Sequence, residues 1–237
     1  MDFKDVFAAA KEGTVDDIRY FVEKNPDDAK RADEDGWTPI HFAAKSNSNV
    51  AVLEYLVSKG ATADTRSNKT GRTPLHDAAM YNTNVDVVEC LIAKGGAKVN
   101  AKKNEDGSTP LHFAAQRNSN VAVLRCLIEK HGADVNAEDI DGMTPIYIAA
   151  SRNPNFEVLD YLVKRQRFDV NTKSPLGLTL LHCAAGANSN VEVLNYLIKQ
   201  GADVKTSAGA GGPTPLDIAE HEGNTDAAAW LRANGGR

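Results

Sequence analysis

The strongest constraint on this chain is a four-residue motif that recurs at a nearly constant interval. The motif begins with threonine and usually continues with proline, an aliphatic residue and histidine. Its six copies lie 35, 36, 35, 35 and 35 residues apart and begin at Thr38, Thr73, Thr109, Thr144, Thr179 and Thr214. A fixed period of this size predicts a solenoid, in which each unit buries its apolar side against the next one.

Each repeated unit predicts two short helices followed by a turn. Thr38 stands before Pro39, and proline is well accommodated at a first helical position, where its missing N–H is not needed. Small and apolar residues, including Ala43 and Ala44, follow at helical spacing. A second apolar run with the same spacing leads to Gly60, which favours the end of a helix. The polar residues after it predict a hairpin-like turn.

Through these motifs, the chain resembles the ankyrin repeat family over nearly its whole length. The resemblance rests on the threonine-led motifs, on Gly-Ala-Asp-Val-Asn at 132–136, and on alanine pairs at 43–44, 78–79, 114–115, 149–150 and 184–185. It implies an all-α solenoid of stacked helix–loop–helix units with short β-hairpin-like turns. We interpret residues 1–237 as a single domain of seven repeats. The predicted repeats are an N-terminal capping repeat at 2–33, internal repeats at 34–68, 69–104, 105–139, 140–174 and 175–209, and a C-terminal capping repeat at 210–237.

The chain departs from the family between the two helices of each internal repeat. The usual glycine is replaced there by Asn-x-Asn, at 47/49, 82/84, 118/120, 153/155 and 188/190. We expect the first asparagine to adopt the left-handed conformation after one helix, and the second to cap the next helix. Local capping is therefore favoured over a ladder of ligand-binding asparagines.

No residue pattern stands out from the repeat template as an active site. His41, His76, His112 and His182 occupy one position per repeat, so roughly 8–10 Å would separate neighbours. That separation is too large for a shared zinc ion with bonds of about 2 Å. The resemblance implies that these histidines tie adjacent turns together. We find no Ser/His/Asp set, carboxylate pair or His/Cys cluster outside the template, and we predict a protein that is not an enzyme and needs no cofactor or metal.

The three cysteines predict buried thiols. Cys90 and Cys126 fall one repeat apart, farther than a disulfide permits, and Cys183 adjoins an alanine pair. An enzyme or metal protein that depends on His112 or Cys183 is the least favoured class. Three sparse cysteines also fit a reducing compartment.

Charge and hydropathy exclude other classes of partner. The chain has 27 basic and 32 acidic residues, which argues against a nucleic-acid binder or an anionic-membrane binder. No segment approaches the length of a membrane-spanning apolar helix, and the first residues lack a signal-peptide pattern. We expect a cytoplasmic monomer; the alternative is a protein whose signal peptide is absent from this sequence.

Positions that vary between repeats predict a partner-binding surface. The resemblance places this surface on the concave side, at the turn tips and the exposed side of the first helices. Trp37 is the strongest single candidate, because tryptophan, tyrosine and arginine are enriched at binding hot spots. Apolar residues at the turn tips of the C-terminal half extend this predicted surface. The predicted residues are Trp37, Arg72, Met143, Leu178, Tyr81, Met80, Lys45, Arg117, Arg152 and Ile140.

The sequence thus predicts a protein–protein interaction module that recognises a partner without catalysis. Two alternatives stay open: a dedicated inhibitor or immunity-type protein that blocks one enzyme, and a microbial effector that mimics a host scaffold. Loss of a purified enzyme's activity on addition of this protein would separate an inhibitor from a passive scaffold.

Overall fold

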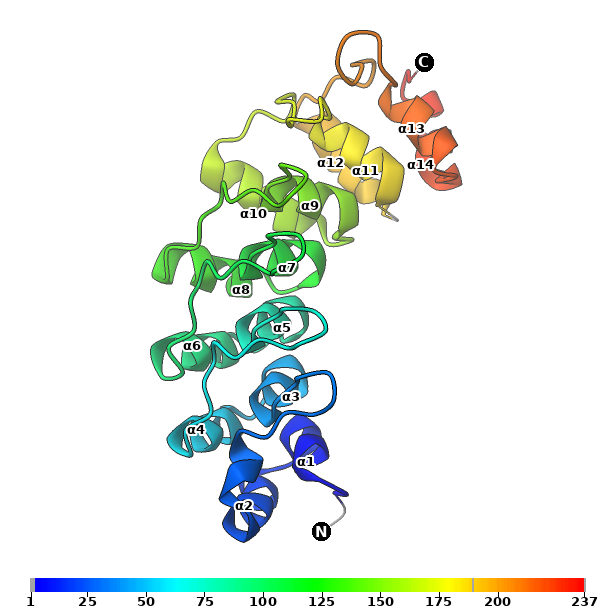
Figure 1. The fold of residues 1–237 in the computed structure, drawn as a ribbon. Coiled ribbons are helices and arrows are strands. Elements are labelled where there is room, and N and C mark those ends of the chain that lie inside the picture. Colours follow the sequence, from blue (N-terminus) through cyan, green and yellow to red (C-terminus); the bar gives the residue numbers. More distant parts are fainter. Residues whose placement is uncertain (1–2, 189, 237) are drawn as a thin grey trace. The chain divides into compact units, whose positions relative to one another are not determined.

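The computed structural model of the chain describes residues 3–188 and 190–236, and in these residues the regular structure is entirely helical. The chain forms two compact units, which we describe separately. The first unit contains Met1–Ala114 and Ala122–Asp134, and the second contains Ala115–Val121 and Val135–Arg237. Figure 1 shows the paired helices that make up each unit.

In the first unit, one helix of each pair packs on the equivalent helix of the neighbouring pair. Helix α3 packs against both α1 and α5, while α2, α4 and α6 form a second row (Figure 1). The helices are α1 (Val6–Glu12), α2 (Val15–Lys24), α3 (Pro39–Ser46), α4 (Val50–Ser58), α5 (Pro74–Tyr81) and α6 (Val85–Ala93), with a short 3₁₀ turn η1 (Pro26–Ala29). The unit also contains most of α7 (Pro110–Arg117) and α8 (Val121–Arg125), and a π-helical turn η2 (Cys126–Lys130).

The second unit repeats this arrangement. Helix α11 packs against α9 and α13, and α12 packs against α10 and α14. The helices are α9 (Pro145–Arg152), α10 (Phe156–Gln166), α11 (Leu180–Ala187), α12 (Val191–Lys199), α13 (Pro215–His221) and α14 (Thr225–Ala233). No described helix is both long enough and apolar enough to cross a membrane.

The threonine-led motifs start helices as predicted, and their histidines form hydrogen bonds to the next repeat. Helix α3 begins at Pro39. The backbone N–H of Thr38 donates to Nδ1 of His41 at 3.2 Å, so the opposite ring nitrogen, Nε2, carries the proton and donates to the carbonyl of Arg72 at 3.3 Å. Burial lowers the pKa of His41 to about 4, which keeps the ring neutral. His76 and His182 make the same bond to the carbonyls of Ser108 and Pro213, and Tyr147 replaces it with a bond from its hydroxyl to Thr172.

The Asn-x-Asn prediction is right for the second asparagine and wrong for the first. Asn49 caps α4, because its Oδ1 accepts from the N–H of Ala51 at 3.1 Å. Asn47, however, is extended, with φ −92° and ψ 122°, and is not left-handed. Its Nδ2 donates to the carbonyls of Ala10 at 3.1 Å and Gly13 at 2.9 Å in the preceding repeat. Extended backbone therefore lets this side chain reach across the stack, and Asn82, Asn153 and Asn188 do the same.

The core and the tips follow the predicted pattern. The alanine pairs are fully buried, which lets neighbouring helices approach closely, and larger aliphatic side chains such as Leu53 and Leu56 fill the space between the rows. All three cysteines are buried and unbridged. A backbone hydrogen bond closes each such turn tip. In the tip before α3, for example, the N–H of Asp33 donates to the carbonyl of Trp37 at 2.8 Å. The tips are hairpin-like turns, without a strand among the described residues.

Candidate partner-binding surface

Five of the predicted partner-binding residues come together in the first unit. Trp37 and Arg72 stand on the tips before α3 and α5, and Lys45, Met80 and Tyr81 lie at the C-terminal ends of these two helices. All five side chains are half-buried. We call these five residues the cation–aromatic surface.

The two cations of this surface lie over aromatic rings. The ammonium of Lys45 is 5.3 Å from the ring centre of Trp37 and 4.9 Å from that of Tyr81. The guanidinium of Arg72 is 5.3 Å from the ring centre of Trp37 and 5.7 Å from that of Phe113. A contact of this kind stabilises by about 0.5–1 kcal/mol when exposed and by about 2 kcal/mol when desolvated. The four contacts together hold two flexible side chains in fixed positions.

The surface continues toward an open pocket beside α1. The rings of Trp37 and Phe42 are 5.7 Å apart, and those of Phe42 and Phe7 are 5.5 Å apart. Phe42 and Phe7 line the pocket, which has a volume of about 630 Å³. Its rim is charged, with both signs represented by Lys4, Asp5, Lys11, Asp33, Glu34 and Asp35. The aromatic row therefore connects the cation–aromatic surface to a recess that offers both apolar and ionic contacts.

A buried carboxylate lies beneath the surface. Asp77, in α5, is fully buried, and its Oδ1 is 3.4 Å from Nε of Arg72. Neither oxygen of Asp77 has a hydrogen-bond partner among the described residues. Burial raises the pKa of Asp77 to about 7, against the opposing effect of the nearby Arg72 and Lys45 cations. Arg72 is therefore positioned both by the ion pair with Asp77 and by its contacts with the rings of Trp37 and Phe113.

Sequence reasoning missed Asp77 and Phe113, although a signal for the first was present. Among the repeats with the threonine-led motif, only Asp77 is charged at the position that follows the histidine position. The other repeats have an apolar residue there, namely Phe42, Phe113, Ile148, Cys183 and Ile218. Phe113 gave no such signal, because its relevance to the surface depends on its contact with Arg72, which only the structure shows.

The other five predicted residues belong to the second unit. Arg117 and Arg152 are exposed at the ends of α7 and α9, and Met143 and Leu178 are half-buried before α9 and α11. Ile140 is 74% exposed. The predicted apolar tips are therefore accessible here, and Leu176, on the next tip, is 57% exposed. A Cβ added to Gly142 would lie 2.9 Å from the ring of Pro175, so these two tips are neighbours. Their role in binding stays a prediction.

Comparison with known proteins agrees with the repeat architecture. A family model described as ankyrin repeats (3 copies) matches residues 6–103, 81–174 and 150–236. No curated protein matches the sequence. Ankyrin repeats are generally protein–protein interaction modules and are typically non-enzymatic. The family matches cover nearly the whole length, and the chain therefore belongs to the ankyrin repeat family.

Proposed function

We propose that this chain binds a partner protein through the cation–aromatic surface of its first unit. The observation that carries the proposal is the pair of cations, Lys45 and Arg72, held over three aromatic rings at positions that vary from repeat to repeat. Stacking of the repeats fixes the residue types at framework positions, whereas stacking does not require two cations over three rings at variable positions, so this arrangement points to recognition.

The chemistry of the surface suits a binding hot spot. Tryptophan, tyrosine and arginine dominate hot spots, where truncation of one side chain costs about 2 kcal/mol or more. Trp37, Arg72 and Tyr81 supply all three types. Because the ring contacts and Asp77 already restrict these side chains, they lose little conformational freedom when a partner binds.

The charges indicate what the partner presents. Arg72 already has Asp77 beside it, whereas Lys45 has ring contacts and no ion pair among the described residues. A partner carboxylate placed over Lys45 supplies that missing counterion. An apolar or aromatic residue next to this carboxylate fits the pocket lined by Phe7 and Phe42. We therefore infer a partner segment in which an acidic residue stands beside an apolar one.

A capture experiment with a matched pair of variants tests the proposal. The full chain is used as bait in lysate of its source organism, and bound proteins are identified by mass spectrometry. The Trp37→Ala, Lys45→Ala double variant removes the surface but leaves Arg72 and Asp77 paired. The control, Trp230→Ala with Lys199→Ala, makes the same chemical changes on helices α14 and α12 of the second unit.

The two variants are expected to behave differently. A partner kept by the wild type and by the control, but lost by the Trp37→Ala, Lys45→Ala variant, supports the proposal once circular dichroism shows that both variants fold. Equal retention by both variants refutes it and directs attention to the apolar tips around Ile140. If the partner is an enzyme whose activity falls on addition of the chain, the protein is an inhibitor and not a scaffold.

A further inference from the structure

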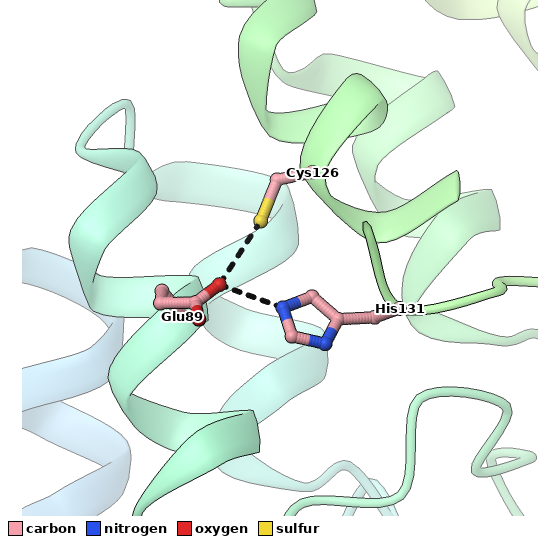
Figure 2. A group of neighbouring side chains, drawn as sticks. All are labelled: Glu89, Cys126 and His131. Carbon is pink, nitrogen blue, oxygen red and sulfur yellow. Dashed lines mark hydrogen bonds and ion pairs between the residues drawn. The ribbon is translucent and has the colours of Figure 1, made fainter. Parts of the chain in front are cut away.

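A second cluster of reactive side chains lies away from the partner-binding surface, between two stacked repeats of the first unit. Among the described residues, Glu89, Cys126 and His131 form one group whose metal-ligating atoms all lie within 4.8 Å of one another. Glu89 stands on α6, Cys126 begins the π-helical turn η2, and His131 directly follows that turn. Figure 2 shows the carboxylate of Glu89 facing both the thiol and the imidazole. The sequence-based prediction that no His/Cys cluster exists outside the repeat template is therefore wrong.

We propose that Glu89, Cys126 and His131 form a binding site for one thiophilic divalent metal ion, with Zn²⁺ as the best match. Carboxylate, thiolate and imidazole are the three ligand types that proteins use for zinc, and three protein ligands leave a fourth position for water. The site would join two adjacent repeats, because Glu89 comes from one repeat and both other ligands come from the next.

The spacing of the donor atoms suits a tetrahedral ion after a small adjustment. Bonds of about 2.0–2.3 Å at tetrahedral angles place ligand atoms roughly 3.3–3.8 Å apart. Sγ of Cys126 is 3.7 Å from Oε2 of Glu89, within that range. Nε2 of His131 is 2.7 Å from the same oxygen, a hydrogen bond that must open by less than about 1 Å to admit the ion. The imidazole and the thiol both donate hydrogen bonds to Oε2, so their protons now occupy the place where a cation would bind.

Neighbouring charges orient Glu89 without occupying this oxygen. The ammonium of Lys130 is 2.8 Å from Oε1, the other carboxylate oxygen, which leaves Oε2 directed at Cys126 and His131. Hydrogen bonds from Lys130 and His131 lower the pKa of Glu89, so the carboxylate is ionised. The side chain of Lys130 is 61% exposed and is able to move outward when a second cation arrives. We assign it a positioning role.

Metal binding at this site requires the loss of one proton. Burial and the adjacent Glu89 carboxylate raise the pKa of Cys126 to about 11, so the metal-free site holds a thiol. When the ion binds, the S–H bond breaks, the proton leaves to solvent and sulfur donates an electron pair to the metal. The imidazole binds through Nε2, so the proton that Nε2 donates to Glu89 in the metal-free site leaves to solvent while a proton from solvent is taken up at Nδ1, with no net change for a neutral ring. Two anionic ligands then balance the charge of a divalent ion.

The preceding repeat supplies an internal comparison. Counted from the capping asparagine of each second helix, Glu54, Cys90 and Lys94 occupy the positions of Glu89, Cys126 and Lys130 one repeat earlier. Lys94 bonds Glu54 at 2.6 Å, as Lys130 bonds Glu89, but Gly95 stands where His131 would be. The earlier site thus has the same carboxylate, thiol and ammonium but lacks the imidazole, and we expect no specific metal binding there. Among the four side-chain positions compared, only that of His131 differs between the two repeats.

Titration of the reduced, metal-free full chain tests the proposal. Zn²⁺ is added in competition with a chromophoric chelator, and Co²⁺ is used as a spectroscopic probe. The wild type is expected to bind one equivalent of either ion. The Co²⁺ form should show a thiolate-to-cobalt charge-transfer band together with visible bands of tetrahedral intensity.

Three variants decide the assignment. His131→Gly reproduces the residue of the preceding repeat and is expected to raise the Kd for Zn²⁺ by at least about 100-fold, beyond the roughly 10–100-fold effect of outer-shell changes. Cys126→Ala should abolish the charge-transfer band, while Cys90→Ala should leave affinity and spectrum unchanged. Circular dichroism checks that each variant folds. Binding that survives His131→Gly, a cobalt spectrum without a thiolate band, or loss of binding in Cys90→Ala overturns the proposal.

Discussion

The buried carboxylate of Asp77 allows a quantitative test of how the first unit is built. The Asp77→Asn variant keeps the size of the side chain and removes its charge. Burial raises the pKa of Asp77 from 3.8 to about 7, and each pH unit between these values corresponds to about 1.4 kcal/mol. The ionised carboxylate therefore costs the folded state on the order of 4 kcal/mol. We expect the variant to be more stable than the wild type above pH 7.

The sign of the pH dependence follows from the direction of the pKa change. Below about pH 4, Asp77 is protonated in both states and imposes no cost. Between pH 4 and pH 7 the unfolded state releases the proton while the folded state keeps it, so the wild type loses stability as pH rises. Above pH 7 the cost is complete. The stability advantage of Asp77→Asn should accordingly grow from near zero at pH 4 and level off above pH 7.

Only the difference between the two proteins isolates this effect. Burial lowers the pKa values of His41 and His76 to about 4 from 6.5. Their contribution to stability is complete above pH 6.5 and is lost as pH falls toward 4, which opposes the contribution of Asp77. Both histidines are present in the wild type and in Asp77→Asn, so subtracting the two stability curves removes them.

The assay is urea unfolding at several pH values between 4 and 8.5, followed by tryptophan fluorescence. A Trp230→Phe background leaves Trp37 as the reporter, and this residue contacts Arg72, the ion-pair partner of Asp77. Glu23→Gln, an exposed change on α2, serves as the control and should show no such trend. A stability difference that does not change with pH, or an Asp77→Asn variant that is less stable than the wild type at pH 8, would refute the reasoning.

Three further predictions concern the stacking and the core. Asn153→Ala should destabilise the second unit by roughly 2–4 kcal/mol in urea unfolding. The Asn153 side chain donates to two carbonyls of the preceding repeat and accepts from the backbone N–H of Asn155, and the variant loses all three hydrogen bonds. A loss of stability below about 1 kcal/mol contradicts this role. Tyr55→Phe should be neutral or stabilising by up to about 2 kcal/mol in the same assay, since the buried hydroxyl of Tyr55 has no hydrogen-bond partner among the described residues. A clear loss of stability would show that the hydroxyl makes a hydrogen bond after all. Burial raises the pKa of Cys183 to about 12, so a thiol reagent at pH 8 should modify it only after urea unfolding, and fast reaction in the native protein would contradict its burial.

Much of the fold was predictable from the sequence, because it depends on local chemistry repeated many times. Proline after threonine marks the start of α3, and Asn49, Asn84, Asn155 and Asn190 each accept a hydrogen bond from the backbone N–H two residues later. Helical spacing of alanine and leucine identified the buried faces. These features involve residues close together in the chain, so residue type and spacing were sufficient.

The candidate partner-binding surface was predictable in composition but not in arrangement. Variation between repeats pointed to Trp37, Lys45 and Arg72. The placement of each cation between rings of two different repeats depends on how the helices stack. Asp77 was visible in the sequence as a charge at an apolar position, but its pairing with Arg72 was not.

Only the tertiary structure decided the features that cross from one repeat to the next. The sequence suggested a left-handed Asn47, yet the residue is extended because its side chain satisfies two carbonyls of the preceding repeat. Glu89 meets Cys126 and His131 for the same reason, since residues 37 and 42 positions away come within bonding distance only when the repeats stack. A repeat pattern determines which residues share a structural position. The distance and rotation between stacked repeats determine which side chains meet.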